Sequence, residues 1–192
     1  MTENNLIKRI GNTGLYVVGG DITQIPTDAI MTAINSEGIW FGGINGTDGA
    51  IRRVAGNHYH AQAGAKMPLS DLQTIVAKGG TKYHQGKFND VVFVVDDLQS
   101  SLEQVIYKGL ETANQEGYYK LLLPAIRMGV MAGIVEKTSE EVILRIKNGI
   151  DAFMSKYGKS TQLEDITFVI YGNIEAAKKL SSDLRDIENS KN

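Results

Sequence analysis

Cysteine is absent from the 192-residue chain. Without cysteine the chain can form neither a disulfide framework nor a thiolate metal site, and a cysteine nucleophile is excluded. No apolar run approaches the length of a membrane span, and the opening MTENNLIKRI lacks the apolar core of a signal peptide. We therefore expect a cytoplasmic protein that does not contact a membrane.

Blocks of basic residues are missing as well. The chain has 20 lysines and arginines against 22 aspartates and glutamates, for a formal net charge of −2. Binding to nucleic acid without sequence preference needs a basic surface, so we predict no nucleic-acid partner. The three histidines, His58, His60 and His84, do not have metal-ligand spacing with nearby acids. We interpret them as surface or structural residues, and predict neither a metal nor another cofactor.

Nothing in the sequence marks a domain boundary. There is no internal repeat, low-complexity tract or proline-rich linker, and the chain contains only three prolines. A chain of this length can build one substantial core and is short for two. We predict a single domain over residues 1–192, with a frayed tail at 189–192.

Strand-like and helix-like segments alternate along the chain. The apolar runs at 91–95 and 121–123 are continuous, which is typical of strands covered on both faces, and long helices between strands imply parallel crossovers. The pattern predicts an α/β fold, a three-layer α/β/α sandwich. We expect strands at 6–10, 15–18, 29–34, 74–77, 91–95, 121–126 and 166–171, and helices at 47–55, 58–67, 101–116, 139–157 and 176–187.

Glycine is abundant although proline is scarce: its 21 residues are about 11% of the 192-residue chain, above the usual ~7%. Many of them follow strand-like runs in the stretch 17–51. A run at 15–18 stops at Gly19-Gly20-Asp21-Ile22, and the run 29–34 ends at Asn35 before a glycine-rich loop that leads into a helix. Closely spaced backbone N–H groups and a helix start suit a phosphate or diphosphate.

Three blocks in this stretch resemble the macrodomain family, whose members bind ADP-ribose. The family signature reads roughly G-D-I-T, then D-A-I-V-N-A-A-N, then G-G-G-V-D-G-A-I. The matching blocks here are Gly20-Asp21-Ile22-Thr23, Asp28-Ala29-Ile30-Met31-Thr32-Ala33-Ile34-Asn35, and Gly42-Gly43-Ile44 with Asp48-Gly49-Ala50-Ile51. The resemblance covers about 15–184, and implies a mixed central sheet between helices with the ligand at the carboxyl ends of the strands.

The first block implies the adenine end of a site at Gly20, Asp21 and Ile22. In the family the aspartate accepts a hydrogen bond from the adenine amino group, and the next backbone N–H meets a ring nitrogen. The alternative role for Asp21 is to cap a turn or a short helix. Asn35 matches the asparagine that reaches the distal ribose, where an amide suits a diol; it could also only shape the turn.

The third block implies the distal ribose and the diphosphate. Gly42, Gly43 and Ile44 resemble the loop that wraps them, although this loop is three residues longer than the family pattern. Asp48 matches the aspartate that orients the substrate and a water in family hydrolases, so Asp48 and Asn35 are the candidate catalytic residues. Asp48 could instead cap the helix starting near Gly49. The longer loop leaves a further alternative, in which Asn45 takes the place of the catalytic aspartate and the site binds without turnover.

A second family loop, P-A-I-S-T-G-I-F-G, is matched by the segment that starts at Pro124. The candidate ligand-binding residues there are Ile126, Arg127, Gly129, Val130 and Met131. The backbone amides of this loop would hold the diphosphate, and Met131 replaces an aromatic residue that stacks on ribose. Arg127 stands where the family has serine; it could add charge to the diphosphate site or lie on the surface.

The last strand ends at Tyr171, which corresponds to a family aromatic that often stacks on adenine, while Asn173 would contact the proximal ribose. Ordinary core packing is the alternative for Tyr171. The resemblance implies a protein that binds ADP-ribose or ADP-ribosylated protein. Such a protein either hydrolyses an ADP-ribosyl ester, phosphate or protein linkage, or reads the group without cleaving it. A Rossmann dinucleotide enzyme is set aside because no G-x-G-x-x-G follows a strand.

Overall fold

One seven-stranded sheet organises the protein. The computed structural model describes residues 5–37, 46–81, 83–128 and 132–187. The strand order is β1-β2-β7-β6-β3-β5-β4. The strands are β1 (Leu6–Ile10), β2 (Thr13–Gly19), β3 (Thr27–Ile34), β4 (Thr74–Ala77), β5 (Phe88–Val95), β6 (Lys120–Pro124) and β7 (Asp165–Ile170).

The sheet is mixed. Its five inner strands, from β2 to β5 in spatial order, are parallel, whereas β1 pairs with β2 and β4 pairs with β5 in antiparallel fashion. The helices are η2 (Ile22–Gln24), α1 (Thr47–Ala55), α2 (His58–Gly64), α3 (Leu102–Gln115), α4 (Ser139–Tyr157) and α5 (Ile174–Arg185). Parallel neighbours need crossover connections, and the helices between the strands supply them.

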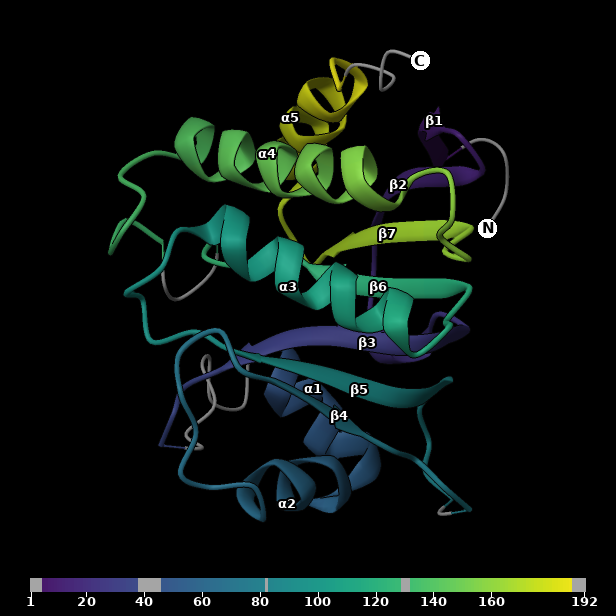
Figure 1. Ribbon diagram of the computed structural model, residues 1–192, viewed down its shortest axis with the longest axis vertical. Coiled ribbons are helices and arrows are strands. Elements are labelled where there is room, and N and C mark those ends of the chain that lie inside the picture. Colours follow the sequence, from purple (N-terminus) through teal and green to yellow (C-terminus); the bar gives the residue numbers. More distant parts are fainter. Residues whose placement is uncertain (1–4, 38–45, 82, 129–131, 188–192) are drawn as a thin grey trace.

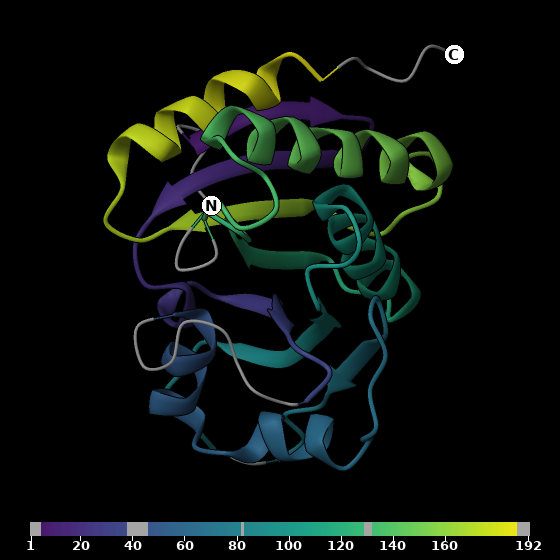
Figure 2. The same cartoon turned by 90° about the vertical axis from the view of Figure 1, so that its left-hand side faces the viewer.

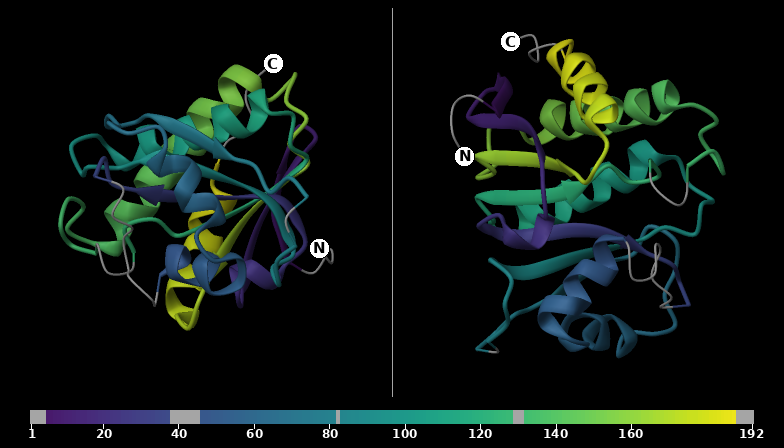
Figure 3. Two further views of the ribbon diagram at one scale, coloured as in Figure 1. Left: turned by 90° about the horizontal axis from the view of Figure 1, so that it is seen from below. Right: turned by 180° about the vertical axis from the view of Figure 1, so that it is seen from behind.

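Helices cover both faces of this sheet. In Figures 1 and 2, α3 and α4 lie on one face, and α1 lies on the other. The view from behind in Figure 3 shows α1 and α2 together in front of the strands. The buried apolar residues accordingly form two clusters, one against α3, α4 and α5 and one against α1 and α2. The predicted α/β/α sandwich with a mixed sheet is confirmed.

The central strands are apolar on both faces, as their sequence predicts. All five residues from Val91 to Val95 in β5 have 0% exposure. The strand starts at Phe88, three residues earlier than predicted, because Phe88 and polar Asp90 continue the pairing with β3 beyond the apolar run. Pairing rather than apolar content sets the length of this strand.

Helices α3 and α4 pack closely where α4 has a glycine. A Cβ atom at Gly149 would lie 2.8 Å from the backbone oxygen of Glu103 and 2.8 Å from Cβ of Ile106. Real Cβ atoms do not approach other heavy atoms so closely, so the two helices can pack at this distance only because residue 149 has no side chain. Within the described ranges no helix is both long and apolar enough to cross a membrane.

Side chains cap the starts of α4 and α5. The Oγ1 atom of Thr138 accepts a hydrogen bond from the Glu141 N–H at 3.1 Å. In return, Glu141 Oε2 accepts from the Lys137 N–H at 2.9 Å. Helix α5 begins at Ile174, earlier than predicted, since the Asn173 side chain caps it.

Candidate functional site

The candidate site lies at the carboxyl edge of the parallel strands. Paired residues put the end of β2 beside the end of β7 (Gly19 with Ile170) and the end of β3 beside the end of β5 (Ile34 with Val95). The end of β6 lies beside β7 in the same direction. The segments that follow these strands therefore meet at one edge, and they carry Gly20, Asp21, Asn35, Ile126, Arg127, Tyr171 and Asn173.

At the end of β2, Asp21 is exposed and caps the short helix η2. Its Oδ1 atom accepts hydrogen bonds from the Thr23 N–H at 2.9 Å and the Thr23 hydroxyl at 2.7 Å. The capping role predicted as an alternative is thus confirmed. Both of these bonds use Oδ1, and Oδ2 takes part in neither of them. The preceding Gly20 has φ +141°, a conformation that favours glycine, and the following Ile22 is buried.

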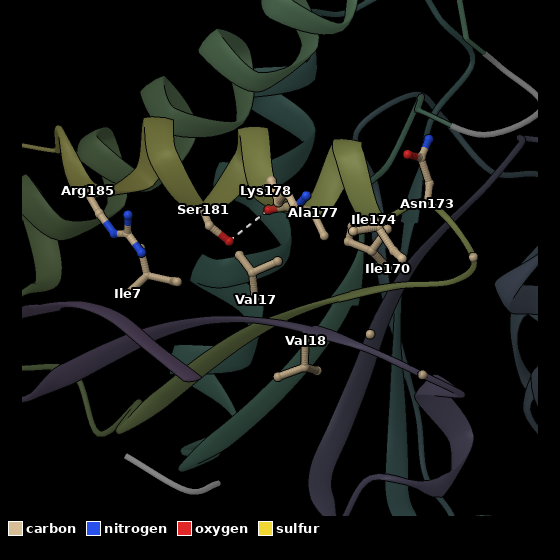
Figure 4. A pocket seen from close by; sticks show the side chains of 13 residues that line it. Ile7, Val17, Val18, Ile170, Asn173, Ile174, Ala177, Lys178, Ser181 and Arg185 are labelled. Atoms are coloured by element: carbon tan, nitrogen blue, oxygen red, sulfur yellow. Dashed lines mark hydrogen bonds between the residues drawn. The ribbon is translucent and has the colours of Figure 1, made fainter. Parts of the chain in front are cut away.

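A cavity of about 630 Å³ opens beside this cap, between the ends of β2 and β7 and helix α5 (Figure 4). Gly20, Gly172 and Asn173 line it at the carboxyl edge. Asn173 Oδ1 accepts from the Ala176 N–H at 2.9 Å, so this residue both caps α5 and lines the cavity. In Figure 4, Lys178 and Ser181 of α5 stand over Val17 of β2, and Arg185 of α5 lies beside Ile7 of β1.

Tyr171 lies next to the same cavity and is 85% exposed. The core-packing alternative for this residue is therefore wrong. Its position directly after β7 places it beyond the last covered residue of the strand, where no helix overlies it. An exposed aromatic ring at this point is available to a flat ligand group.

A second, smaller cavity of about 230 Å³ lies at the ends of β3 and β5. It is lined by Asn35, Ser36, Glu37, Asp97 and Leu98. The Ser36 N–H donates to Asp97 Oδ1 at 2.8 Å, which ties the segment after β3 to the segment after β5. Asn35 is half-buried at this position. The cavity offers an amide and carboxylates, groups that suit hydroxyls.

Asp48 is buried in the first turn of α1, with 1% exposure. The N-cap residue is Gly46 and makes no side-chain bond, so the prediction that Asp48 caps the helix is wrong. The helix begins two residues earlier than that alternative assumed, which moves Asp48 from the cap into the first turn. There the positive end of the helix dipole favours its charge.

The contact of Asp48 with His60 was not predicted from the sequence. His60 Nε2 lies 3.5 Å from Asp48 Oδ1, and the His60 ring packs at 5.0 Å, between ring centroids, from that of Phe93. His60 is only 9% exposed, so of the two readings offered for this histidine the surface reading is wrong. Residues 48 and 60 lie on different helices, and neither spacing nor periodicity signals their contact.

Arg127 is also buried, with 1% of its side chain exposed, so of the two alternatives left open for it the surface location is wrong. Its guanidinium donates to both carboxylate oxygens of Asp96, at 2.8 and 3.1 Å, and to Glu136 Oε1 at 2.8 Å. Burial works to lower the pKa of Arg127, but the hydrogen bonds and charges of Asp96 and Glu136 outweigh burial and raise this pKa above its usual value. The side chain stays charged at every physiological pH.

Comparison with known proteins gives the chain its family. No family model matches it. A protein of Cronobacter turicensis named O-acetyl-ADP-ribose deacetylase is 34% identical over 132 residues, which cover 60% of this chain and 69% of that protein. A protein of Citrobacter rodentium with the same name is 27% identical over 179 residues, 83% of this chain and 89% of that protein. The Trypanosoma brucei macrodomain in complex with ADP superposes with a TM-score of 0.71 at 19% identity, over 90% of this chain and 69% of that one.

The chain belongs to the macrodomain family. The first signature block of this macrodomain directly follows β2 and forms the cap and start of η2, and the second block forms most of β3 and the residue after it. Asp28 in the second block is structural, since its Oδ2 accepts from the N–H groups of Tyr119 and Lys120 at 2.7 and 2.9 Å. Those bonds hold the start of β3 against β6.

Several predicted site residues of the macrodomain lie outside the described residues. They are Gly42, Gly43, Ile44, Asn45, Gly129, Val130 and Met131. Across the part of the chain that is described, no group of three or more histidine, aspartate or glutamate side chains could hold a metal ion.

Proposed function

We propose that this macrodomain binds ADP-ribose or a derivative of it and hydrolyses an ADP-ribosyl linkage. The observation that carries the proposal is the gathering of predicted ligand residues from four separate segments at one edge of the sheet. Two cavities open at that edge, one beside Asp21 and Asn173 and one at Asn35. The names of the bacterial relatives, O-acetyl-ADP-ribose deacetylases, favour an ester as substrate.

In this proposal the ligand extends along the edge. Adenine meets Oδ2 of Asp21 and the exposed ring of Tyr171, the proximal ribose meets Asn173, and the distal ribose meets Asn35. The buried carboxylate of Asp48 takes a proton from a water that attacks an ester carbonyl, with loss of the ribose hydroxyl as the acyl C–O bond breaks, or that attacks the anomeric carbon, with loss of the linkage oxygen as its bond to that carbon breaks; the proton passes to the leaving oxygen. The amide of Asn35 orients the ribose hydroxyls for that attack.

The test combines binding with turnover. Calorimetry with ADP-ribose, ADP, AMP and NAD should give the tightest binding to ADP-ribose. Release of acetate from O-acetyl-ADP-ribose, and of ADP-ribose from an auto-modified transferase, should be measured for wild type, Asp48→Ala and Asn45→Ala. We expect Asp48→Ala to lower the rate by ~100-fold or more, the scale of one general base, while ADP-ribose affinity changes little.

A reader without turnover is the second candidate, and the buried Thr32 favours it. Thr32 stands in β3 where the family signature has its first asparagine, so the site has one amide fewer. Tight binding of ADP-ribose without release from any of these substrates would establish the reader. Equal rates for wild type and Asp48→Ala would remove Asp48 from the mechanism.

We also propose that residues 1–192 act as one domain in the cytoplasm. Support comes from the single sheet, whose strands are drawn from Leu6 to Ile170, and from its two clusters of buried residues. One cooperative unfolding transition is expected in differential scanning calorimetry, and two separate transitions would contradict the single domain.

A further inference from the structure

The cavity beside α5 extends beyond the part that the proposed function uses. Helix α5 forms one wall of it, and with 12 residues this helix is about 18 Å long. In the proposed function adenosine occupies the end of the cavity at Gly20 and Asn173. The remaining part, which we call the α5 groove, is lined by Ile7, Val17, Ala177, Lys178, Ser181 and Arg185 (Figure 4).

One side of α5 forms the wall of the α5 groove. Residues that line the cavity recur at every fourth position of this helix, namely Asn173, Ala177, Ser181 and Arg185. That spacing places them along one side of the helix. Val17 of β2 lies opposite and gives the groove an apolar floor. The Ser181 hydroxyl donates to the Ala177 carbonyl at 2.7 Å, so its proton is used within the helix and is not offered to an anion.

Both charged residues of the α5 groove are cations. They are Lys178 and Arg185, and none of the described residues that line the cavity is acidic. Lys178 has a neighbouring acid, since its Nζ atom lies 3.2 Å from Glu175 Oε1, but the two side chains are 69% and 85% exposed. A pair as exposed as this is weak and is screened by salt. An anion that enters the groove can therefore replace Glu175 beside Lys178.

The next residue, Lys179, makes a structural contact instead. Its Nζ atom lies 2.9 Å from Glu140 Oε1 on α4, and Lys179 is not among the residues that line the cavity. Neighbouring residues of a helix point about 100° apart, so the two lysines face different surroundings. Lys179 joins α5 to α4, whereas the charge of Lys178 stands at the cavity. Packing of the helices accounts for the first placement and not for the second.

Distance along the helix separates the two cations of the groove. Lys178 lies about 7.5 Å along the axis from Asn173, and Arg185 lies about 10 Å further. The long side chain of Lys178 reaches back over the first distance to a substituent of a ribose at Asn173. Arg185 stands in the last turn, where the negative end of the helix dipole disfavours an anion. An anion attached to that ribose would therefore meet Lys178, while Arg185 adds attraction from a distance.

We propose that Lys178 binds a phosphate carried by the proximal ribose. This inference rests on the proposed function, in which that ribose meets Asn173. The protein then favours derivatives of ADP-ribose that bear a phosphomonoester on the 2′ or the 3′ hydroxyl of the adenosine, because the lysine ammonium donates charge-assisted hydrogen bonds to it. The 5′ side of the ligand, with its diphosphate and distal ribose, takes no part in this contact.

The experiment compares ligands that differ by this phosphate alone. Calorimetry measures the Kd of AMP, of adenosine 2′,5′-bisphosphate and of adenosine 3′,5′-bisphosphate, and then that of ADP-ribose with and without the phosphate at the preferred position. Wild type should bind one of the bisphosphates about tenfold more tightly than AMP, the scale of one charge-assisted hydrogen bond at an exposed site. ADP-ribose should gain a similar factor from the same phosphate, because separate contacts add.

Lys178→Met is the decisive variant, and Lys179→Met is its matched control, since each removes one positive charge from the same helix. In Lys178→Met the ratio of the AMP and bisphosphate Kd values should fall from about tenfold to less than about twofold, whereas Lys179→Met should keep the ratio. Arg185→Met should lower the ratio by about twofold at low salt and leave it unchanged at high salt, as expected of a charge that acts from a distance. In NMR spectra the Lys178 and Ser181 amides should shift more with the bisphosphate than with AMP.

Several outcomes would overturn the inference. They are equal affinities of wild type for AMP and for both bisphosphates, an unchanged ratio in Lys178→Met, and an equal loss in Lys179→Met, which would make the net charge of α5 responsible. If wild type binds ADP-ribose without preferring a bisphosphate over AMP, the inference fails and the proposed function stands. If the preference depends on Lys178 in a wild type that does not bind ADP-ribose, the proposed function fails and the phosphate site at Lys178 stands.

Discussion

Asp21 caps a helix and has a proposed ligand contact, and Asp21→Asn should keep the first role while it loses the second. The cap uses Oδ1, which accepts both bonds from Thr23. The proposed adenine contact uses Oδ2. Asparagine retains one oxygen, which can stay on the cap, and places an NH₂ group where Oδ2 was. The adenine amino group would then face a second donor.

The structure gives different magnitudes for the two roles. Asparagine caps helices about as well as aspartate, so the free energy of unfolding should change by less than ~0.5 kcal/mol. The donor facing a donor leaves two polar groups unmatched, at a cost of ~1–3 kcal/mol, or a rise in Kd of about 5- to 150-fold. Rotating the amide would restore the ligand contact only by breaking the cap, and the free energy of unfolding would then fall.

The assay is calorimetry with ADP-ribose and with its hypoxanthine analogue, alongside chemical denaturation. Hypoxanthine carries an acceptor in place of the amino group but also a hydrogen on N1, which would face the Ile22 N–H in both proteins, so Asp21→Asn should lose most of the preference for ADP-ribose that wild type shows. The control is Asp186→Asn, which makes the same charge change at an exposed residue just after α5. The same base preference in wild type and Asp21→Asn would refute the placement of adenine at Asp21.

Three further predictions concern buried groups. Gly149→Ala should lower the free energy of unfolding by ~1–3 kcal/mol although alanine has the better helix propensity, because the new Cβ atom meets the α3 backbone. The control Gly64→Ala, at an open position, should not lower it. Chemical denaturation measures the free energy of unfolding of both variants. Burial, and then the charge of Asp90, raises the pKa of Tyr59 to about 12. Because this pKa is higher in the folded than in the unfolded chain, Tyr59 contributes stability below pH ~10. Up to ~2 kcal/mol of the free energy of unfolding should be lost between pH ~10 and pH 12 in wild type, but not in Tyr59→Phe. His60→Leu should lower the free energy of unfolding by ~1–3 kcal/mol, because it removes a polar neighbour of Asp48. In the double variant with Asp48→Asn, the free energy of unfolding should fall by less than the sum of the two single effects.

The elements of the fold could be predicted because local rules determine them. The helix at 47–55 ends where Gly56, with φ +60°, stops it. The continuous valines of β5 predicted a strand covered on both faces, and the sheet places it there. Some boundaries differ because a polar residue continues a pairing or caps a helix, as Asp90 and Asn173 do, and apolar pattern registers neither role. Others were predicted too late in the chain, since β6 ends at Pro124 rather than at 126 and α2 ends at Gly64 rather than at 67.

The contacts within the site could not be predicted in this way. Arg127 meets Asp96 across 31 positions and Glu136 across 9, and both bonds depend on how β5, β6 and the start of α4 are arranged in space. The meeting of Asp48 with His60 similarly depends on the packing of α1 against α2. The family resemblance identified the segments that reach the edge of the sheet, while their side-chain partners follow from tertiary structure.

The motif residues of this macrodomain differ in whether their placement stabilises the fold. Asp28 satisfies two backbone N–H groups and Asn173 caps a helix, so the fold alone explains both. Tyr171 instead leaves a large apolar ring 85% exposed, and Asp48 keeps a carboxylate at 1% exposure. Exposing the ring forgoes the free energy of its burial, and burying the carboxylate requires desolvation. The cost of these two placements supports the proposed roles, in which Tyr171 stacks on adenine and Asp48 acts on the water that attacks the substrate.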